Sequence, residues 1–180
     1  MLKMMIKNNK EQLLIGLIGD THIRTLEENI IQYIIDDFKE KKIDYLFHTG
    51  DFTNYRVYKK LVDIFGQEKV IGIGGNMDDP KISKELPKRI EMDLFGHKVF
   101  MIHGEGGPHN IIKLLNKKYD LSEYEIIIFG HAHRPFNEKG NDGKLYLSPG
   151  TPTDKRFTDI NSYGYLKISR DKVEPNIVYL

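Results

Sequence analysis

The sequence has no cysteine and no tryptophan among its 180 residues. Without thiols the chain cannot form disulfides, thiolate zinc sites or a cysteine nucleophile, so any metal that it binds must have nitrogen and oxygen ligands. It also has no excess of charge of either sign, because 27 basic residues face 26 acidic ones for a formal net charge of +1. With its charges balanced, the chain is not expected to bind nucleic acid or an anionic membrane stably by overall electrostatic attraction.

Long hydrophobic runs are absent too, since no stretch approaches the roughly 18 apolar residues that a membrane span needs. The start of the chain is rich in lysine and methionine, and an apolar run follows at 13–19. A signal peptide is disfavoured because no A-x-A-like cleavage site is present and because Asp20 and His22 end the run. We interpret 1–12 as a short flexible leader before a buried strand, and we expect one cytoplasmic domain over 1–180 with no membrane contact.

The sequence alternates between apolar strands and amphipathic helices. In the first half, expected strands at 13–19, 43–48 and 70–73 flank two helical stripes, 26–38 and 55–65, the first beginning with a capping box of Thr25 and Glu28. In the second half we expect a hairpin of 89–94 and 98–103, a helix at about 110–119 and strands at 125–129, 145–148, 163–168 and 176–180. The strands at 13–19, 43–48, 70–73 and 125–129 read as buried central strands. This order predicts an α/β protein of two stacked mixed sheets with helices outside.

Side chains typical of metal sites follow five expected strands in succession. The carboxyl ends of ordered strands lie along one edge of a sheet, so these side chains are expected to converge. They include two carboxylates, four imidazoles and one amide, which is more than one tetrahedral ion takes and suits two divalent ions. We assign the bridge between the ions to Asp51, because each oxygen of a carboxylate can bind a different cation. The seven candidate ligands are Asp20, His22, Asp51, Asn76, His103, His131 and His133.

Each motif taken alone has an ordinary structural interpretation. Asp20 could cap a helix, and Gly50-Asp51 and Gly75-Asn76 are common turn dipeptides. It is their joint order at successive strand ends that favours a metal site. Of the other three histidines, His97 and His109 read as turn and helix-start residues, and His48 is a candidate support for the metal ligands.

The series Asp20-x-His22, Gly50-Asp51, Gly75-Asn76-x-Asp78, His103-Gly104 and Gly130-His131-x-His133 resembles the motifs of the calcineurin-like metallophosphoesterases. The length and order resemble the small single-domain phosphodiesterase branch, often called YfcE-type, over roughly 13–168. The resemblance implies a four-layer α-β-β-α sandwich. It implies one metal held by Asp20, His22, Asp51 and His133, and another held by Asp51, Asn76, His103 and His131. It also likens Ser148-Pro149-Gly150-Thr151 and Arg156 to the family's Asn-Pro-Gly-Ser turn and following arginine.

Two positions depart from the family pattern. Many relatives have a histidine that assists the leaving group where this chain has Met77, a side chain that cannot transfer a proton. After His103-Gly104 the branch often has another histidine, and this chain has Glu105, whose role is left open between supporting carboxylate and solvated turn residue.

The resemblance therefore implies a metal-dependent phosphodiester hydrolase that acts on small phosphodiesters through a metal-bridging hydroxide. We count Asp51, Asn76 and Asp78 as its catalytic residues, with Asp78 supporting the Asn76 loop. The cofactors are two divalent ions, with Mn²⁺ the first choice and Ni²⁺, Fe²⁺ or Zn²⁺ the alternatives. The rival interpretation is a non-catalytic protein-binding scaffold of the same fold, like the retromer subunit. A barrel-fold zinc hydrolase is excluded because a full barrel takes about 250 residues; the natural substrate and assembly into homo-oligomers stay open.

Overall fold

The computed structural model describes residues 2–6, 9–23, 30–154 and 158–180. In them the chain forms eleven strands and four helices. The strands are β1 (Leu2–Met5), β2 (Gln12–Ile18), β3 (Tyr45–His48), β4 (Val70–Gly72), β5 (Arg89–Leu94), β6 (His97–Ile102), β7 (Ile126–Phe129), β8 (Pro135–Lys139), β9 (Leu145–Pro149), β10 (Ser162–Ser169) and β11 (Val173–Tyr179). The helices are α1 (Ile30–Glu40), α2 (Tyr55–Phe65), α3 (Pro80–Glu85) and α4 (Ile111–Lys118).

The strands form two mixed sheets. A five-stranded sheet has the order β11-β10-β2-β3-β4, in which β2, β3 and β4 run parallel, with Leu17 of β2 opposite Phe47 of β3. A six-stranded sheet has the order β1-β5-β6-β7-β9-β8, in which β6, β7 and β9 run parallel. The helical stripe at 55–65 forms α2, which ends at Gly66 as the sequence predicts. The structure adds an N-cap at Asn54, whose side chain accepts from the amide of Arg56.

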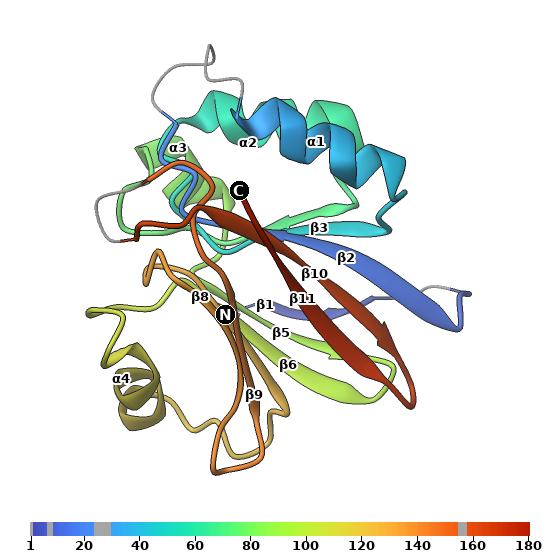
Figure 1. The fold of residues 1–180 in the computed structure, drawn as a ribbon, viewed down its shortest axis with the longest axis vertical. Helices are drawn as coiled ribbons and strands as arrows, with labels where there is room; N and C mark the ends of the chain where they lie inside the picture. The colour runs from blue at the N-terminus through green and yellow to red at the C-terminus, as the bar shows by residue number, and fades with distance from the viewer. Residues whose placement is uncertain (1, 7–8, 24–29, 155–157) are drawn as a thin grey trace.

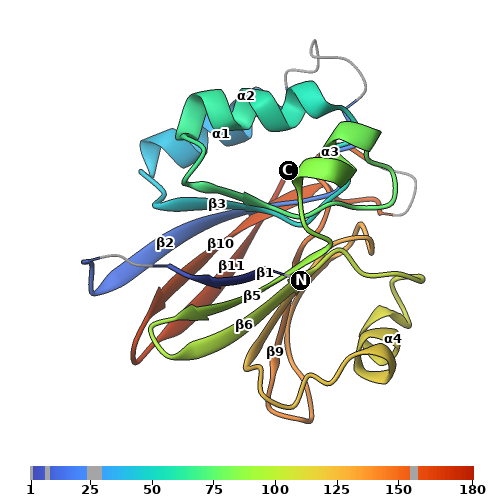
Figure 2. The same ribbon diagram turned by 180° about the vertical axis from the view of Figure 1, so that it is seen from behind.

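The two sheets stack face to face, with helices on both outer sides (Figures 1 and 2). Apolar residues of both sheets, among them Ile15, Phe47 and Ile128, form the core between them. Helices α1 and α2 cover the outer face of the five-stranded sheet, and α4 covers the outer face of the six-stranded sheet through Ile111 and Leu115. The predicted sandwich of two mixed sheets with helices outside is confirmed.

The expected leader is where the structure differs most from the sequence analysis. Residues 2–5 form strand β1, which pairs in parallel with β5, and Met4 and Ile6 pack against the core between the sheets. Three of the four residues of β1 are apolar, but so short a run has no strand pattern of its own, and the strand forms by pairing with the existing edge of the sheet. The expectation that 70–73 is a central strand is wrong in one respect. The strand there, β4, is buried, but it lies at an edge of its sheet.

Two further elements, α3 and β8, were not expected from the sequence. The expected capping box of Thr25 and Glu28 lies outside the described residues. In the described part of the chain, no helix has the length and apolar character that a membrane crossing would require.

Candidate metal centre

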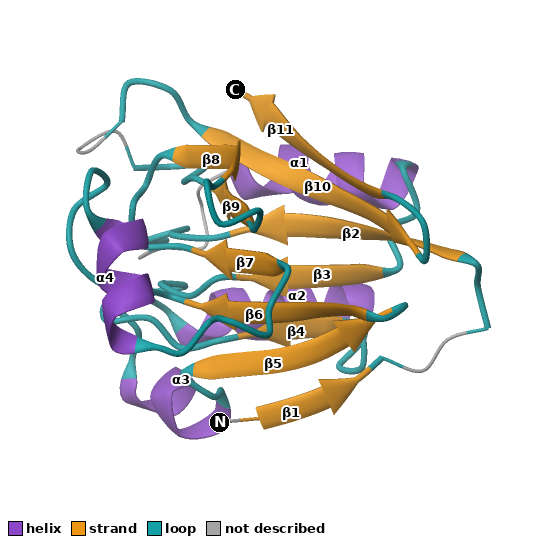
Figure 3. Cartoon of the chain, turned by 90° about the horizontal axis from the view of Figure 1, so that it is seen from below, coloured by secondary structure: helices purple, strands orange, loops and turns teal. Residues whose placement is uncertain are grey.

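The candidate ligands lie on loops at one edge of the sandwich. Strands β2, β6 and β7 point toward that edge in Figure 3, so the loops that follow them meet there. Asp20 and His22 follow β2, Asp51 follows β3, Asn76 follows β4, His103 follows β6, and His131 and His133 follow β7. The strands of both sheets thus bring all seven residues to one place, although 113 positions separate the first from the last.

Backbone hydrogen bonds hold these loops together. The amides of Asp20 and His22 donate to the carbonyls of Gly50 and Asp51, at 3.0 and 3.1 Å. The loops approach so closely at Gly75 that a Cβ atom there would lie 2.1 Å from Oδ1 of Asp51. Glycine at this position is therefore a requirement of the site and not merely of the turn.

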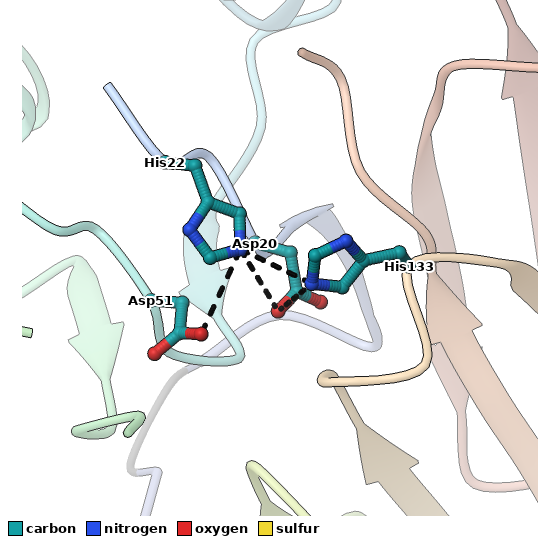
Figure 4. A group of neighbouring side chains, drawn as sticks. All are labelled: Asp20, His22, Asp51 and His133. Carbon is teal, nitrogen blue, oxygen red and sulfur yellow. Dashed lines mark hydrogen bonds and ion pairs between the residues drawn. The ribbon is translucent and has the colours of Figure 1, made fainter. Parts of the chain in front are cut away.

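One group of ligands consists of Asp20, His22, Asp51 and His133, whose ligand atoms all lie within 4.8 Å of one another. Their side chains point toward a common centre in Figure 4. Nε2 of His22 lies 3.1 Å from Nε2 of His133 and 3.7 Å from Oδ2 of Asp51. Oδ1 of Asp20 lies 3.6 Å from Nε2 of His133.

A second group lies on the other side of Asp51. Oδ1 of Asn76 lies 3.0 Å from Nε2 of His103 and 2.9 Å from Nδ1 of His131, and the two ring nitrogens are 3.3 Å apart. Oδ2 of Asp51 lies 3.4 Å from Nε2 of His103. Asp51 therefore belongs to both groups, which is the place a bridging ligand must occupy; the bridging role itself stays a prediction.

Burial and close contacts shift the pKa values of the carboxylates and imidazoles of the site. Burial raises the pKa of the Asp20 carboxyl to about 8. Burial also opposes ionisation of Asp51, but the hydrogen bond and charge of His103 outweigh it and lower its pKa to about 2. Burial likewise disfavours the charged form of His103, yet the bond to Asp51 and the nearby carboxylates raise its pKa to about 9. The site thus stabilises a proton between Asp51 and His103, which is the kind of charge that a metal ion replaces on binding.

The donor set fits divalent metal ions. Each group contains two imidazole nitrogens that face each other, at 3.1 Å in the first group and 3.3 Å in the second. A carboxylate oxygen lies beside the nitrogens in each group. Burial lowers the pKa of His133 to about 4, so its ring is neutral and offers a lone pair, which is the form that binds metals. A cation at the centre of each group would satisfy these converging nitrogens and oxygens together.

The far side of the imidazoles is fixed by other residues. Nδ1 of His103 donates to the carbonyl of Thr49 at 2.8 Å, so its Nε2 is left to face the ligand group. Nδ1 of His22 lies 3.3 Å from Oγ1 of Thr53. Such partners set the tautomer and the angle of a metal-binding ring.

Asp154 is a site residue that the sequence analysis missed. Its carboxylate is buried, and Oδ2 lies 3.3 Å from Nδ1 of His133 on the side away from the ligand group. Its amide donates to Oγ1 of Thr151, whose hydroxyl donates to the carbonyl of Asp20 at 2.7 Å. The signal available in the sequence was its place four residues after Gly150, in the turn that resembles the family's Asn-Pro-Gly-Ser segment.

The predicted catalytic residue Asp78 faces the backbone rather than the ligand groups. It accepts hydrogen bonds from the amides of Gly75, Thr53 and Asp51, at 2.7, 2.8 and 3.2 Å. These three bonds tie the Asn76 loop to the Asp51 loop. Asp78 therefore holds the two loops in place, as the sequence analysis expected of it, and its assignment as a catalytic residue stays a prediction.

The remaining residues that the sequence singled out lie around the site. Met77 is 45% exposed, and its amide donates to Oδ1 of Asp51 at 2.7 Å. His48 is buried and stacks on Phe52; burial keeps its pKa well below 6.5, and its Nδ1 accepts from the Gly50 amide. His48 thus supports the Asp51 loop. Glu105 forms an ion pair with Lys118 at 2.8 Å, and Arg156 lies outside the described residues.

Backbone strain is concentrated at the site. Five candidate ligands have positive φ, from 45° to 63°: Asp20, His22, Asp51, His131 and His133. Side chains other than glycine adopt this region at a cost on the order of 1 kcal/mol each, and such residues cluster at functional sites. The fold therefore gives up stability at these positions to aim the side chains inward.

Residues 13–171 match the calcineurin-like phosphoesterase superfamily domain, and the chain belongs to this family. It is 31% identical over 166 residues to a probable metallophosphoesterase of Methanothermobacter thermautotrophicus, with 92% of each chain covered. It is 26% identical over 147 residues to a phosphodiesterase of Methanocaldococcus jannaschii, covering 76% of this chain and 82% of that one.

Solved structures share the fold. A structure described as a novel archaeal phosphodiesterase has a TM-score of 0.72 at 24% identity, and the match covers 93% of this chain and all of that one. Vps29 of Entamoeba histolytica, solved in complex with Zn²⁺, has a TM-score of 0.69 at 19% identity, covering 93% and 99% of the two chains. The family relationship and the buried Asp and His cluster together define a metallophosphoesterase enzyme.

Proposed function

We propose that this chain is a dinuclear metal-dependent phosphodiesterase that hydrolyses small phosphodiesters. The observation that carries the proposal is the pair of ligand groups that share Asp51, with Oδ2 at 3.7 Å from His22 and 3.4 Å from His103. The activity is supported by the relative from Methanocaldococcus jannaschii, which is named a phosphodiesterase. Two divalent ions in these groups supply charge neutralisation at a phosphate and lower the pKa of a bound water toward neutrality.

The residues of the chain set the charge of the site. With both aspartates ionised and the imidazoles and Asn76 neutral, the ligands carry a charge of −2 against +4 on two divalent ions. A net positive charge remains, and it attracts an anionic ester. The neutral amide of Asn76 contributes an oxygen ligand without reducing this attraction.

The same residues limit which esters react well. A general acid contributes roughly 10² to 10⁴ in rate by protonating the departing oxygen. The loop that carries Asn76 has the exposed thioether of Met77 where such a donor would lie. We therefore propose diesters with acidic leaving groups as the favoured substrates, ahead of alkyl diesters and of monoesters with a second negative charge.

The test is turnover of bis(p-nitrophenyl) phosphate by protein stripped of metal with a chelator and then reloaded with Mn²⁺, Ni²⁺, Fe²⁺ or Zn²⁺. We expect no turnover without metal, turnover after reloading, and slower turnover of p-nitrophenyl phosphate. A non-catalytic protein-binding scaffold of the same fold is the competing function. Metal uptake without turnover of either ester by any of the four reloaded forms would support the scaffold and overturn the proposal.

A further inference from the structure

We propose that the cavity beside the metal centre binds a second anionic group, a phosphate, on the diester substrate. This inference rests on the proposed function and adds a substrate class to it. The cavity has a volume of about 420 Å³, and its lining includes Asn76 and His103 of the second ligand group. It therefore opens directly from the place where the scissile phosphate is expected to bind.

The charged groups that line the cavity are mostly cationic. Lys88, Arg89 and Lys118 lie on its wall, and Glu105 is the one carboxylate there. An anion that enters meets a net positive lining that continues the positive charge of the loaded metal centre. A substrate with two separated phosphates is thus held at both ends.

Lys88 lines the cavity close to the second ligand group. Its ammonium donates to the carbonyl of Gly75 at 3.1 Å, one residue before the ligand Asn76. A Cβ atom on Gly74 would lie 3.3 Å from the same nitrogen, so the lysine lies along a backbone without side chains. One of its hydrogens is used by the carbonyl, and an ammonium has three to donate.

The other two cations are held at the ring of Tyr119. The guanidinium carbon of Arg89 lies 5.3 Å from the ring centroid, and Nζ of Lys118 lies 5.9 Å from it. Phe100 packs against the same ring with centroids 5.6 Å apart. The Tyr119 ring thus has two cations and a neighbouring aromatic ring around it, and it holds the two positive charges at the cavity wall, which favours an anion there.

The carboxylate of Glu105 competes with a bound phosphate for Lys118. Its carboxylate accepts from Nζ of Lys118 at 2.8 and 2.9 Å, and both side chains are about half exposed. A bound phosphate must take Lys118 from this exposed ion pair, which costs little because such pairs are weak. Opposite effects are therefore expected from neutralising the two partners.

The test compares two substrates with the same scissile diester, the p-nitrophenyl ester of thymidine 5′-phosphate with and without a 3′-phosphate. We measure the ratio of kcat/KM for the two, which cancels any general loss of activity in a variant. In the metal-loaded protein the ratio should exceed one. Lys118→Gln and Lys88→Gln should each lower it about threefold to tenfold, and Glu105→Gln should raise it.

Lys117→Gln is the matched control, since Lys117 is exposed on the same helix and does not line the cavity. It should leave the ratio unchanged. A ratio of one or less in the unmodified protein, or equal ratios in the Lys118 and Glu105 variants, would overturn the subsite.

A binding measurement separates this inference from the proposed function. Calorimetry on the metal-loaded protein should show tighter binding of thymidine 3′,5′-bisphosphate than of thymidine 5′-monophosphate, with the difference reduced in Lys118→Gln. If neither ester is hydrolysed, the proposed function fails. Tighter binding of the bisphosphate would still support the subsite in that case. Equal binding of the two nucleotides rejects the subsite, whatever the turnover.

Discussion

The two oxygens of the Asp51 carboxylate have different partners. Oδ2 faces both ligand groups, while Oδ1 accepts the amide of Met77 at 2.7 Å. That hydrogen bond fixes the carboxylate plane, and the Asp78 bonds to three backbone amides fix the loop behind it. The ligand that both metals are expected to share is therefore firmly oriented by the backbone around it.

Asp154 should act on metal affinity through His133. Asp154→Asn removes the charge 3.3 Å from Nδ1 of the ring and makes the imidazole a weaker ligand. We expect metal affinity to fall on the order of tenfold, as for other outer partners of ligating histidines. Titration of stripped protein with Mn²⁺, followed by calorimetry, measures it. An unchanged affinity would mean that Asp154 serves only the local turn.

Met77 should make the rate depend on the acidity of the leaving group. Over a series of substituted phenyl diesters, the logarithm of the rate should fall steeply as the pKa of the leaving phenol rises. Met77→His should flatten this dependence and speed the poorest substrates on the order of tenfold, which is below the full effect of a general acid. The gain is partial because three backbone amides hold the Asp78 carboxylate in place, so it cannot turn freely to orient the new ring.

Met77→Gln is the control, since it is polar and of similar length but has no titratable proton. It should keep the steep dependence. A flat dependence in the unmodified enzyme would show that another donor acts, and His109 would be the next residue to change.

At the scale of elements, the strands were predictable where their own residues carry the signal. The apolar runs that became β2, β3 and β7 are buried on both faces, so composition alone indicates them. Strands β1 and β8 are exposed edge strands, and their pairing with β5 and β9 supplies the order that their sequences lack. Helix α3 has six residues, too short for a periodic pattern, and is specified by its Asp79 cap and by Pro80.

The side chain of His97 links the β5–β6 hairpin to the β10–β11 hairpin, and its titration should make the stability of the fold depend on pH. Nε2 of His97 lies 3.1 Å from the carbonyls of Ser169 and Arg170, and Nδ1 lies 2.9 Å from Glu125. Carbonyls and carboxylates only accept, so this arrangement favours the doubly protonated ring. Burial opposes that charge, but the bonds to Glu125 and to the two carbonyls outweigh it and raise the pKa of His97 above 6.5.

Because the folded pKa is raised, the stabilisation is complete below about pH 6.5 and is lost as the pH rises through the folded pKa. We expect His97→Gln to lower the free energy of unfolding on the order of 0.5 kcal/mol at pH 5.5 and by less at pH 9. Urea unfolding of both proteins at the two pH values measures the difference. A cost that does not change with pH would show that the ring serves by packing alone.

At the scale of the whole molecule, the sandwich converts distant sequence positions into one site. The ordering of ligands at strand ends predicted which seven residues converge, because parallel strands of each sheet share an edge. The sequence could not show the positive φ of five candidate ligands or the buried contact of Asp154 with His133, since both depend on how loops that are distant in the sequence pack together. The cationic cavity was hidden for the same reason: β5, the loop after β6, and α4 each supply part of it.

The number of metal ions held per chain tests the central claim most directly. Protein stripped of metal, reloaded with Mn²⁺ and freed of excess ion should contain two ions per chain by elemental analysis. Asp20→Ala and Asn76→Ala, each affecting one ligand group, should contain about one, and Asp51→Ala should lose occupancy at both. One ion per chain in the unmodified protein, or two in Asp51→Ala, would contradict a dinuclear centre that shares Asp51.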